Sequence, residues 1–135
     1  DRPLNSLSDI FGEGIFKVIK ILYNKKEPQV SVIPIQKGDI DSEMVKYFQL
    51  SEQIQTAVML EVELDDDGII TQSSGIVIQA MPGAKKKDIE RISKVLAEVK
   101  SLGTYFNKGL APDKVMEEIL PFEFDLIIST TVYFF

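Results

Sequence analysis

The 135-residue sequence contains no cysteine, no histidine and no tryptophan. Without cysteine, the chain forms no disulfide and offers no thiol nucleophile. Without histidine, it lacks the side chain that most often serves as a general base near neutral pH. The usual zinc ligands are therefore missing, and carboxylates and carbonyls are the remaining candidate ligands. We expect that the protein is not an enzyme and that this chain holds no metal and no cofactor.

Positive charge and long apolar runs are also scarce. The formal net charge is −6, which disfavours nucleic-acid binding because such binding uses cationic side chains to neutralise phosphates. No apolar run approaches the roughly 20 residues of a transmembrane helix. Because no charged and apolar stretch precedes Leu4, we expect no leader sequence. The 44% hydrophobic and 27% charged composition is that of a soluble globular domain. We expect a cytoplasmic protein that binds neither nucleic acid nor membranes.

A β-hairpin is predicted in the middle of the chain. Within residues 57–64, apolar and acidic side chains alternate, which is typical of a strand that is buried on one face. Residues 65–68 favour a turn because aspartate tolerates a bent backbone and glycine accepts a positive φ. The return strand covers residues 69–80, and Gly75 within it indicates either a β-bulge or a close approach of another part of the chain.

Acidic residues gather around this turn, and we considered whether they bind calcium. A calcium-binding loop places its ligands at alternating positions over about twelve residues and ends with a glutamate. The cluster lacks that spacing, so we interpret it as a solvated hairpin tip. Its members are Glu61, Glu63, Asp65, Asp66 and Asp67.

Two further strands and a helix are predicted before the hairpin. Residues 15–23 are apolar and β-branched, which indicates a strand buried on much of both faces, and residues 29–35 predict a second strand with Pro34 at an edge. Residues 42–54 predict a helix that begins at Asp41 or Ser42 and is buried on much of its circumference. The polar residues at its end, Ser51, Glu52 and Gln53, form either a binding site or hydrogen bonds with backbone groups that the helix leaves free. We favour the second interpretation.

The sequence changes character after residue 84. Residues 85–120 favour short helices with narrow apolar stripes, interrupted by glycines and with Pro112 at the first position of the last helix. Residues 122–129 alternate again and predict a strand. Taken alone, the apolar stripes are expected to be core. They consist of Ile89, Ile92, Val95, Leu96, Val99, Val115, Met116 and Ile119.

The order of several short motifs resembles the 33 kDa chaperonin family of redox-regulated heat-shock holdases. The resemblance extends over nearly the whole chain. It is carried by Gly12–Gly14, Val32, Pro34, Gly38–Ile40, Tyr47, Phe48, Ser51, Glu52, Gln53, Thr56–Val58, Gly75–Gln79, Met81, Pro82, Gly83 and Ala84.

The resemblance implies an arrangement and an activity. It implies a helix sandwiched between sheet layers, and a helical linker that loosens to bind unfolded client proteins through its apolar stripes. The family continues into a zinc module with paired cysteines that act as a redox switch. This chain contains no cysteine, so the resemblance implies an ATP-independent holdase without that switch.

We therefore expect an α+β fold with antiparallel sheet layers around a buried helix, followed by a small helical segment. Residues 1–84 are expected to form the C-terminal part of a chaperone core, and residues 85–135 a helical linker ending in a strand. The aromatic end at 132–135 predicts a homo-oligomer or completion by further segments of chain. The alternatives are a small carboxylate-based catalytic domain, favoured by a polar pocket containing Glu52, and a pure oligomerisation module.

Overall fold

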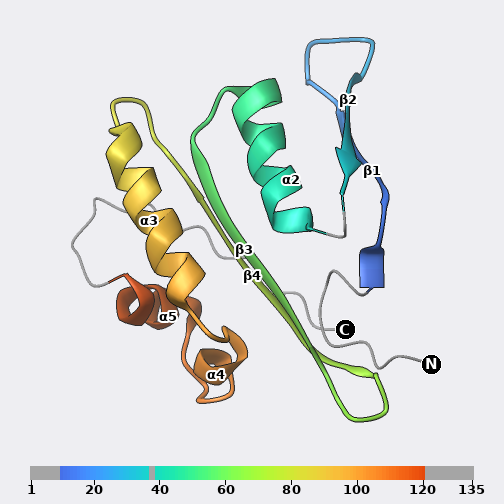
Figure 1. The fold of residues 1–135 in the computed structure, drawn as a ribbon. Helices are drawn as coiled ribbons and strands as arrows, with labels where there is room; N and C mark the ends of the chain where they lie inside the picture. Colours follow the sequence, from blue (N-terminus) through green and yellow to red (C-terminus); the bar gives the residue numbers. More distant parts are fainter. Residues whose placement is uncertain (1–9, 37–38, 121–135) are drawn as a thin grey trace.

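The computed structural model describes residues 10–36 and 39–120. Two antiparallel hairpins and a group of helices form successive layers, with α2 (Ile40–Tyr47) between the hairpins (Figure 1). One hairpin consists of β1 (Gly14–Lys20) and β2 (Gln29–Ile35), and the other of β3 (Thr56–Leu64) and β4 (Ile70–Gln79). The helices α3 (Lys86–Glu98), α4 (Gly103–Phe106) and α5 (Pro112–Ile119) follow β4. The expected α+β fold is confirmed.

The central hairpin has the predicted strands and turn. Thr56 pairs with Gln79 at one end, and the register shifts between Glu63 and Leu64 at the other. In the turn, Gly68 has a φ of 77°, which glycine adopts without a Cβ clash. The carboxylate of Asp65 closes the turn by accepting hydrogen bonds from the backbone N–H groups of Asp67 and Ile69.

Gly75 marks a close approach and not a bulge. It lies directly opposite Leu60 in the ladder, and a Cβ built on it would come within 2.7 Å of Leu60 Cδ2. The missing side chain therefore makes room for a leucine on the neighbouring strand. The backbone N–H of Leu60 points out of the sheet edge and donates to Asp41 Oδ2 of α2 at 2.8 Å.

The first hairpin is half-buried on one face and exposed on the other. The inner face contacts α2, and the Phe16 ring meets that of Tyr47 edge-on at a centroid distance of 6.2 Å. The prediction that residues 15–23 are buried on both faces is wrong, because apolar side chains of the outer face are exposed. They include Ile15, Ile19, Val30 and Val32. The strand also ends earlier, at Lys20.

The N-cap of α2 lies two or three residues before the predicted cap at Asp41 or Ser42. Asp39 is the N-cap, and its Oδ1 accepts a hydrogen bond from the Ser42 backbone N–H at 3.2 Å. Residues 48–52 form a π-helical turn and not a continuous α-helix. The helix is also less buried than predicted: Glu43 and Tyr47 are its buried side chains, while Leu50 is 75% exposed.

The helical layer, defined here as α3, α4 and α5, packs on the β3–β4 hairpin on the side opposite α2 (Figure 1). Pro112 occupies the first turn of α5 as predicted. The loop between α4 and α5 includes Gly109, which has a φ of 73°. The predicted strand at 122–129 and the aromatic end lie outside the described residues, and the division of the chain at residue 84 stays a prediction.

Candidate functional site

An apolar interface joins the helical layer to the sheet. Buried residues of β3 and β4 face buried residues of the helices in one continuous cluster. On the sheet these are Ala57, Ile76 and Ile78, and on the helices Ile89, Ile92, Leu96, Val115 and Ile119. Val95, Val99 and Met116 are partly buried and pack against the cluster. All eight apolar residues singled out in the helical segment therefore converge on this interface.

The sequence analysis missed one buried residue of the interface, Leu102. Its side chain is completely buried. Leu102 lies in the connection between α3 and α4, where no periodic stripe includes it. A single apolar residue between polar neighbours gives no periodic signal, which is why the sequence pattern did not identify Leu102.

Two carboxylates add a polar contact at the edge of this interface. Glu61 Oε2 accepts a hydrogen bond from the Gly103 backbone N–H at 2.9 Å. Glu63 Oε1 accepts one from the Ser101 hydroxyl at 3.0 Å, and that hydroxyl accepts in turn from the Thr104 backbone N–H at 3.3 Å. The interpretation of Glu61 and Glu63 as part of a solvated tip is therefore wrong, because both side chains hold the helical layer.

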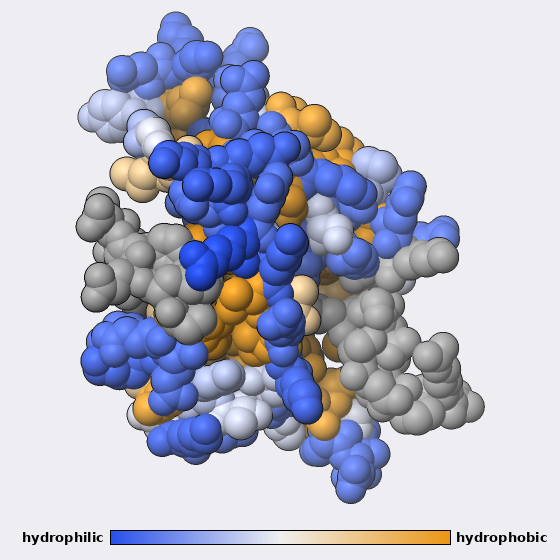
Figure 2. Space-filling model, turned by 60° about the vertical axis from the view of Figure 1, so that its left-hand side comes forward, coloured by the Kyte–Doolittle hydropathy of each residue, from blue (hydrophilic) through white to orange (hydrophobic). Residues whose placement is uncertain are grey.

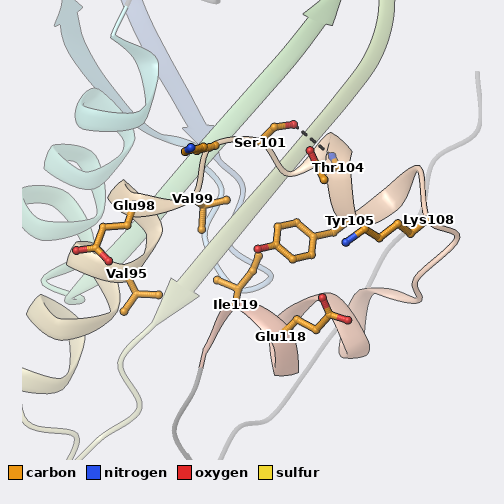
Figure 3. A pocket seen from close by; sticks show the side chains of 10 residues that line it. Val95, Glu98, Val99, Ser101, Thr104, Tyr105, Lys108, Glu118 and Ile119 are labelled. Carbon is orange, nitrogen blue, oxygen red and sulfur yellow. Dashed lines mark hydrogen bonds between the residues drawn. The ribbon is translucent and has the colours of Figure 1, made fainter.

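A groove of about 630 Å³ lies between the three helices. Figure 3 shows the Tyr105 side chain extending between α4 and Ile119 of α5, with Val95 and Val99 on the α3 side. Lys108 Nζ is 5.6 Å from the centroid of the Tyr105 ring. In a space-filling view that brings the α3 side forward, hydrophobic residues are visible in a hollow bordered by hydrophilic ones (Figure 2).

A second groove, of about 640 Å³, lies along β3 and is lined by residues of α2, of α3 and of both faces of the strand. Its apolar lining includes Val45, Leu60 and Leu96, and its polar lining includes Asp41. Burial raises the pKa of Asp41, and the hydrogen bond from the Leu60 backbone offsets part of this effect. The apolar interface is therefore reachable from solvent on both sides of α3.

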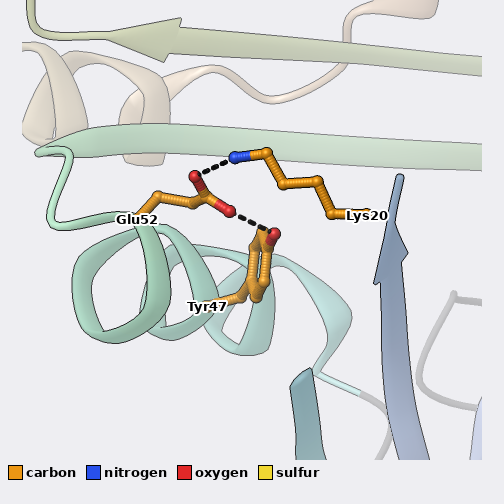
Figure 4. Close-up of polar contacts among 3 residues, drawn as sticks. All are labelled: Lys20, Tyr47 and Glu52. Atoms are coloured by element: carbon orange, nitrogen blue, oxygen red, sulfur yellow. Dashed lines mark hydrogen bonds and ion pairs between the residues drawn. The ribbon is translucent and has the colours of Figure 1, made fainter. Parts of the chain in front are cut away.

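Glu52, which was considered as a catalytic candidate, makes structural contacts. Its carboxylate accepts hydrogen bonds from Lys20 Nζ of β1 at 2.5 Å and from the Tyr47 hydroxyl at 2.7 Å (Figure 4). The Lys20 ammonium, followed by the Tyr47 hydroxyl, lowers the pKa of Glu52, and the same carboxylate raises the pKa of Tyr47. These contacts join the first hairpin to the end of the helix, and Glu52 lines neither groove.

The other residues of the family motifs lie at corners of the chain. Ser51 and Gln53 are exposed, and Gln53 has a φ of 57°, where the helix ends and the chain turns towards β3. Phe48 is half-buried, and its ring meets that of Tyr47 edge-on. Met81, Pro82 and Gly83 form the turn between β4 and α3, in which the Ala84 N–H donates to the Met81 carbonyl at 3.0 Å.

The cysteine and histidine ligands that zinc sites commonly use are missing from the sequence. The described residues also bring no three acidic side chains together as a metal site. In the same part of the chain, no helix is both long and apolar enough to cross a membrane.

Comparisons with known proteins agree with this arrangement. A family model described as Hsp33 protein matches residues 2–135. The chain is 37% identical to the 33 kDa chaperonin of Agathobacter rectalis over 97% of this chain and 46% of that protein. It is 38% identical to that of Clostridium perfringens over 93% and 40%. The crystal structure of the 33 kDa chaperonin (HSP33) from Thermotoga maritima superimposes with a TM-score of 0.70 at 27% identity, over 93% of this chain and 44% of that one.

The chain thus spans less than half the length of the relatives that it matches. The match nevertheless extends over nearly all of this chain, in sequence and in structure. The chain belongs to the Hsp33 protein family, the 33 kDa chaperonins.

Proposed function

We propose that this chain is the client-binding part of an ATP-independent holdase, which binds unfolded proteins through apolar surface exposed when the helical layer leaves the sheet. The observation that carries this proposal is the convergence of the eight apolar helical residues on one interface with β3 and β4. Membership of a chaperone family supports it. The proposed clients are unfolded proteins, and the proposed location is the cytoplasm.

The helical layer has the properties of a detachable element. The α4 helix has four residues and α5 has eight, and isolated helices of that length are not stable in water. Once detached, they would lose their folded form and become an exposed apolar chain segment. The sheet face beneath them would be uncovered at the same time, and contiguous apolar surface of this kind binds unfolded chains non-specifically.

The proposed activity needs neither nucleotide nor thiol. The sequence contains no phosphate-binding glycine motif, and it contains no cysteine that could bind zinc or form a disulfide. Within this chain, the remaining oxidisable side chains are methionines, whose oxidation disturbs packing without acting as a dithiol switch. We therefore propose that client binding by this chain does not depend on redox state.

The test is light scattering of a heat-unfolded client, with the chain treated beforehand with reductant or with dilute peroxide. We expect equal suppression of aggregation by both samples and no effect of ATP. If neither sample suppresses aggregation, client binding would be assigned to the segments of the related 33 kDa chaperonins that lie outside the part matching this chain. Suppression only after brief peroxide treatment would contradict the proposal, because the chain contains no thiol.

A matched pair of substitutions tests the binding surface. Ile92 is 3% exposed on the inner face of α3, and Ala97 is exposed on the same helix. Ile92→Ser removes apolar contact area from the proposed surface, whereas Ala97→Ser changes an exposed position by one hydroxyl. We expect only Ile92→Ser to reduce the suppression measured per folded molecule, with the folded fraction determined by circular dichroism.

A carboxylate-based enzyme is the less favoured alternative. Glu52 was its candidate residue, and its carboxylate is occupied by Lys20 and Tyr47. Self-association is a separate proposal, supported by the exposed outer face of the first hairpin. It does not compete with client binding, because the two surfaces belong to different layers of the fold.

A further inference from the structure

The contacts of Glu61 and Glu63 concentrate on one short segment of the helical layer. Both residues project from the β3 face that also carries Ala57, because side chains two apart on a strand share a face. They bind groups that are 42 and 38 residues away in sequence, in the connection from α3 to α4. The donors are a backbone N–H and a hydroxyl, so each bond joins a carboxylate to a neutral group.

We propose that Glu61 and Glu63 form a carboxylate latch, which controls how readily residues 101–119 leave the sheet. This inference rests on the proposed function, in which that departure exposes the client-binding surface, and it names the residues that regulate it. The latch consists of Glu61, Glu63, Ser101 and Gly103.

The position of Leu102 explains how two bonds can control a whole segment. Ser101 and Gly103 flank Leu102, which is completely buried in the interface. The Leu102 carbonyl also accepts hydrogen bonds from the backbone N–H groups of Tyr105 and Phe106 in α4, for which Leu102 is the N-cap residue. The latch therefore fixes both sides of the most buried residue in this connection, and α4 and α5 follow it in the chain.

The lack of a side chain at Gly103 is a second, independent indication that the Glu63 carboxylate lies close to this segment. A Cβ built on Gly103 would overlap the carboxylate group of Glu63. The glycine is the first residue of α4 and has no positive φ, so its backbone does not require glycine. The Glu63 carboxylate occupies the space that a side chain at this position would take.

The latch lies at an edge of the interface where it can open locally. Glu61, Glu63 and Ser101 are half-buried, so water can replace each bond when the segment moves outward. The strands of the β3–β4 ladder pair through backbone groups along their length. Across the ladder, Glu61 Oε2 accepts one long side-chain hydrogen bond, from the Ser74 hydroxyl at 3.5 Å. Opening of the segment is therefore expected to occur without unfolding of the hairpin.

The first test is amide hydrogen exchange of the 135-residue chain and two double variants. Glu61→Leu with Glu63→Leu removes both acceptors. Glu61→Gln with Glu63→Gln keeps an acceptor oxygen at each position and is the matched control. Because a hydrogen bond to a charged group is worth roughly a factor of ten or more in an equilibrium, we expect exchange within residues 101–119 to be at least about tenfold faster in the leucine variant. Exchange in β3 and β4 should stay unchanged, and exchange in the glutamine variant should lie between that of the parent chain and that of the leucine variant, because the neutral acceptors form weaker bonds.

A second variant opens the latch without changing either acid. Gly103→Ala should displace the Glu63 carboxylate and accelerate the same amides. In a chain that already carries Glu63→Ala, the Gly103→Ala substitution should have little further effect, because the carboxylate that the new methyl group would meet is gone. Glu90→Leu, at an exposed position of α3, controls for the loss of one negative charge.

The outcomes separate the latch from the proposed function. Unchanged exchange in residues 101–119 would overturn the latch, and so would equal acceleration throughout the hairpin. Faster local exchange with stronger suppression of client aggregation is the result that we expect. Faster local exchange without any gain in suppression would leave the latch established and contradict the proposed client-binding surface.

Discussion

The Tyr47 hydroxyl donates a 2.7 Å hydrogen bond to Glu52, five residues further along the chain. Tyr47 is 6% exposed at the end of α2, and Glu52 ends the π-helical turn that follows. The same carboxylate binds Lys20 of β1, so one side chain joins the first hairpin, the helix and the turn before β3. This junction holds the layer on the side of the β3–β4 hairpin opposite the helical layer.

The Glu52 contacts predict a loss of stability in acid. Lys20 and Tyr47 lower the pKa of Glu52 below its usual value of 4.5. Their contribution to stability is therefore present above pH 4.5 and is lost as the pH falls through the lowered pKa. Glu52→Gln should lower the melting temperature at pH 7 and flatten its dependence on pH below 4.5. Thermal melts of both proteins across this range check the prediction, and parallel curves would contradict it.

The raised pKa of Tyr47 predicts a loss of folding stability as the pH rises into the alkaline range. The Glu52 carboxylate and burial raise its pKa above 10.0, so the neutral phenol is favoured in the folded protein. Its contribution is present below pH 10 and is lost as the pH rises through the raised value. Tyr47→Phe should remove that part of the alkaline loss of stability. Denaturation at pH 8 and pH 11 measures it, and an unchanged alkaline loss would tell against the contact.

The raised pKa of Asp41 predicts that the negative charge of this side chain can be removed without loss of stability near neutral pH. Burial raises the pKa of Asp41, so its contribution is most favourable below pH 3.8 and is lost as the pH rises through the raised value. Asp41→Asn keeps an oxygen that can accept from the Leu60 N–H but carries no charge. We expect equal or greater stability at pH 7 in urea denaturation. Asp41→Leu is the control that removes the acceptor, and it should be less stable than the asparagine variant.

Leu102 predicts a large effect from one truncated side chain. It is completely buried, and truncating a buried leucine to alanine typically costs about 2–5 kcal/mol. Leu102→Ala should therefore destabilise the chain by an amount in that range and increase the binding of a hydrophobic dye. Leu50→Ala, at a position 75% exposed, should change the stability by less than about 0.5 kcal/mol. Similar costs for the two substitutions would contradict the burial of Leu102.

The outer face of the first hairpin predicts self-association. Ile19 is 56% exposed and Val30, its partner across the ladder, is 52% exposed. Ile19→Lys places a charge on this apolar face without touching the packed inner face. We expect the parent chain to form oligomers and the variant to be smaller in multi-angle light scattering. A parent chain that remains monomeric at high concentration and binds no hydrophobic dye would contradict this prediction.

The sequence by itself determined the local structure and the family. Alternation along residues 57–64 and the turn at 65–68 predicted the central hairpin because strand periodicity and turn chemistry are properties of neighbouring residues. Helical spacing identified Ile89, Ile92 and Leu96 as one face for the same reason. The order of short motifs identified the family, which the comparisons confirm.

Only the tertiary structure decided which polar residues meet. The alternation in residues 57–64 placed Glu61 and Glu63 on the face of the strand that Leu60 does not occupy. It could not indicate that the helical layer covers that face. Glu52 binds a lysine 32 residues away, and Glu61 binds a backbone group 42 residues away. Such contacts depend on how the layers stack, and local periodicity carries no information about the partner. A carboxylate that the sequence pattern predicts to be exposed to solvent can therefore join two layers in the folded protein.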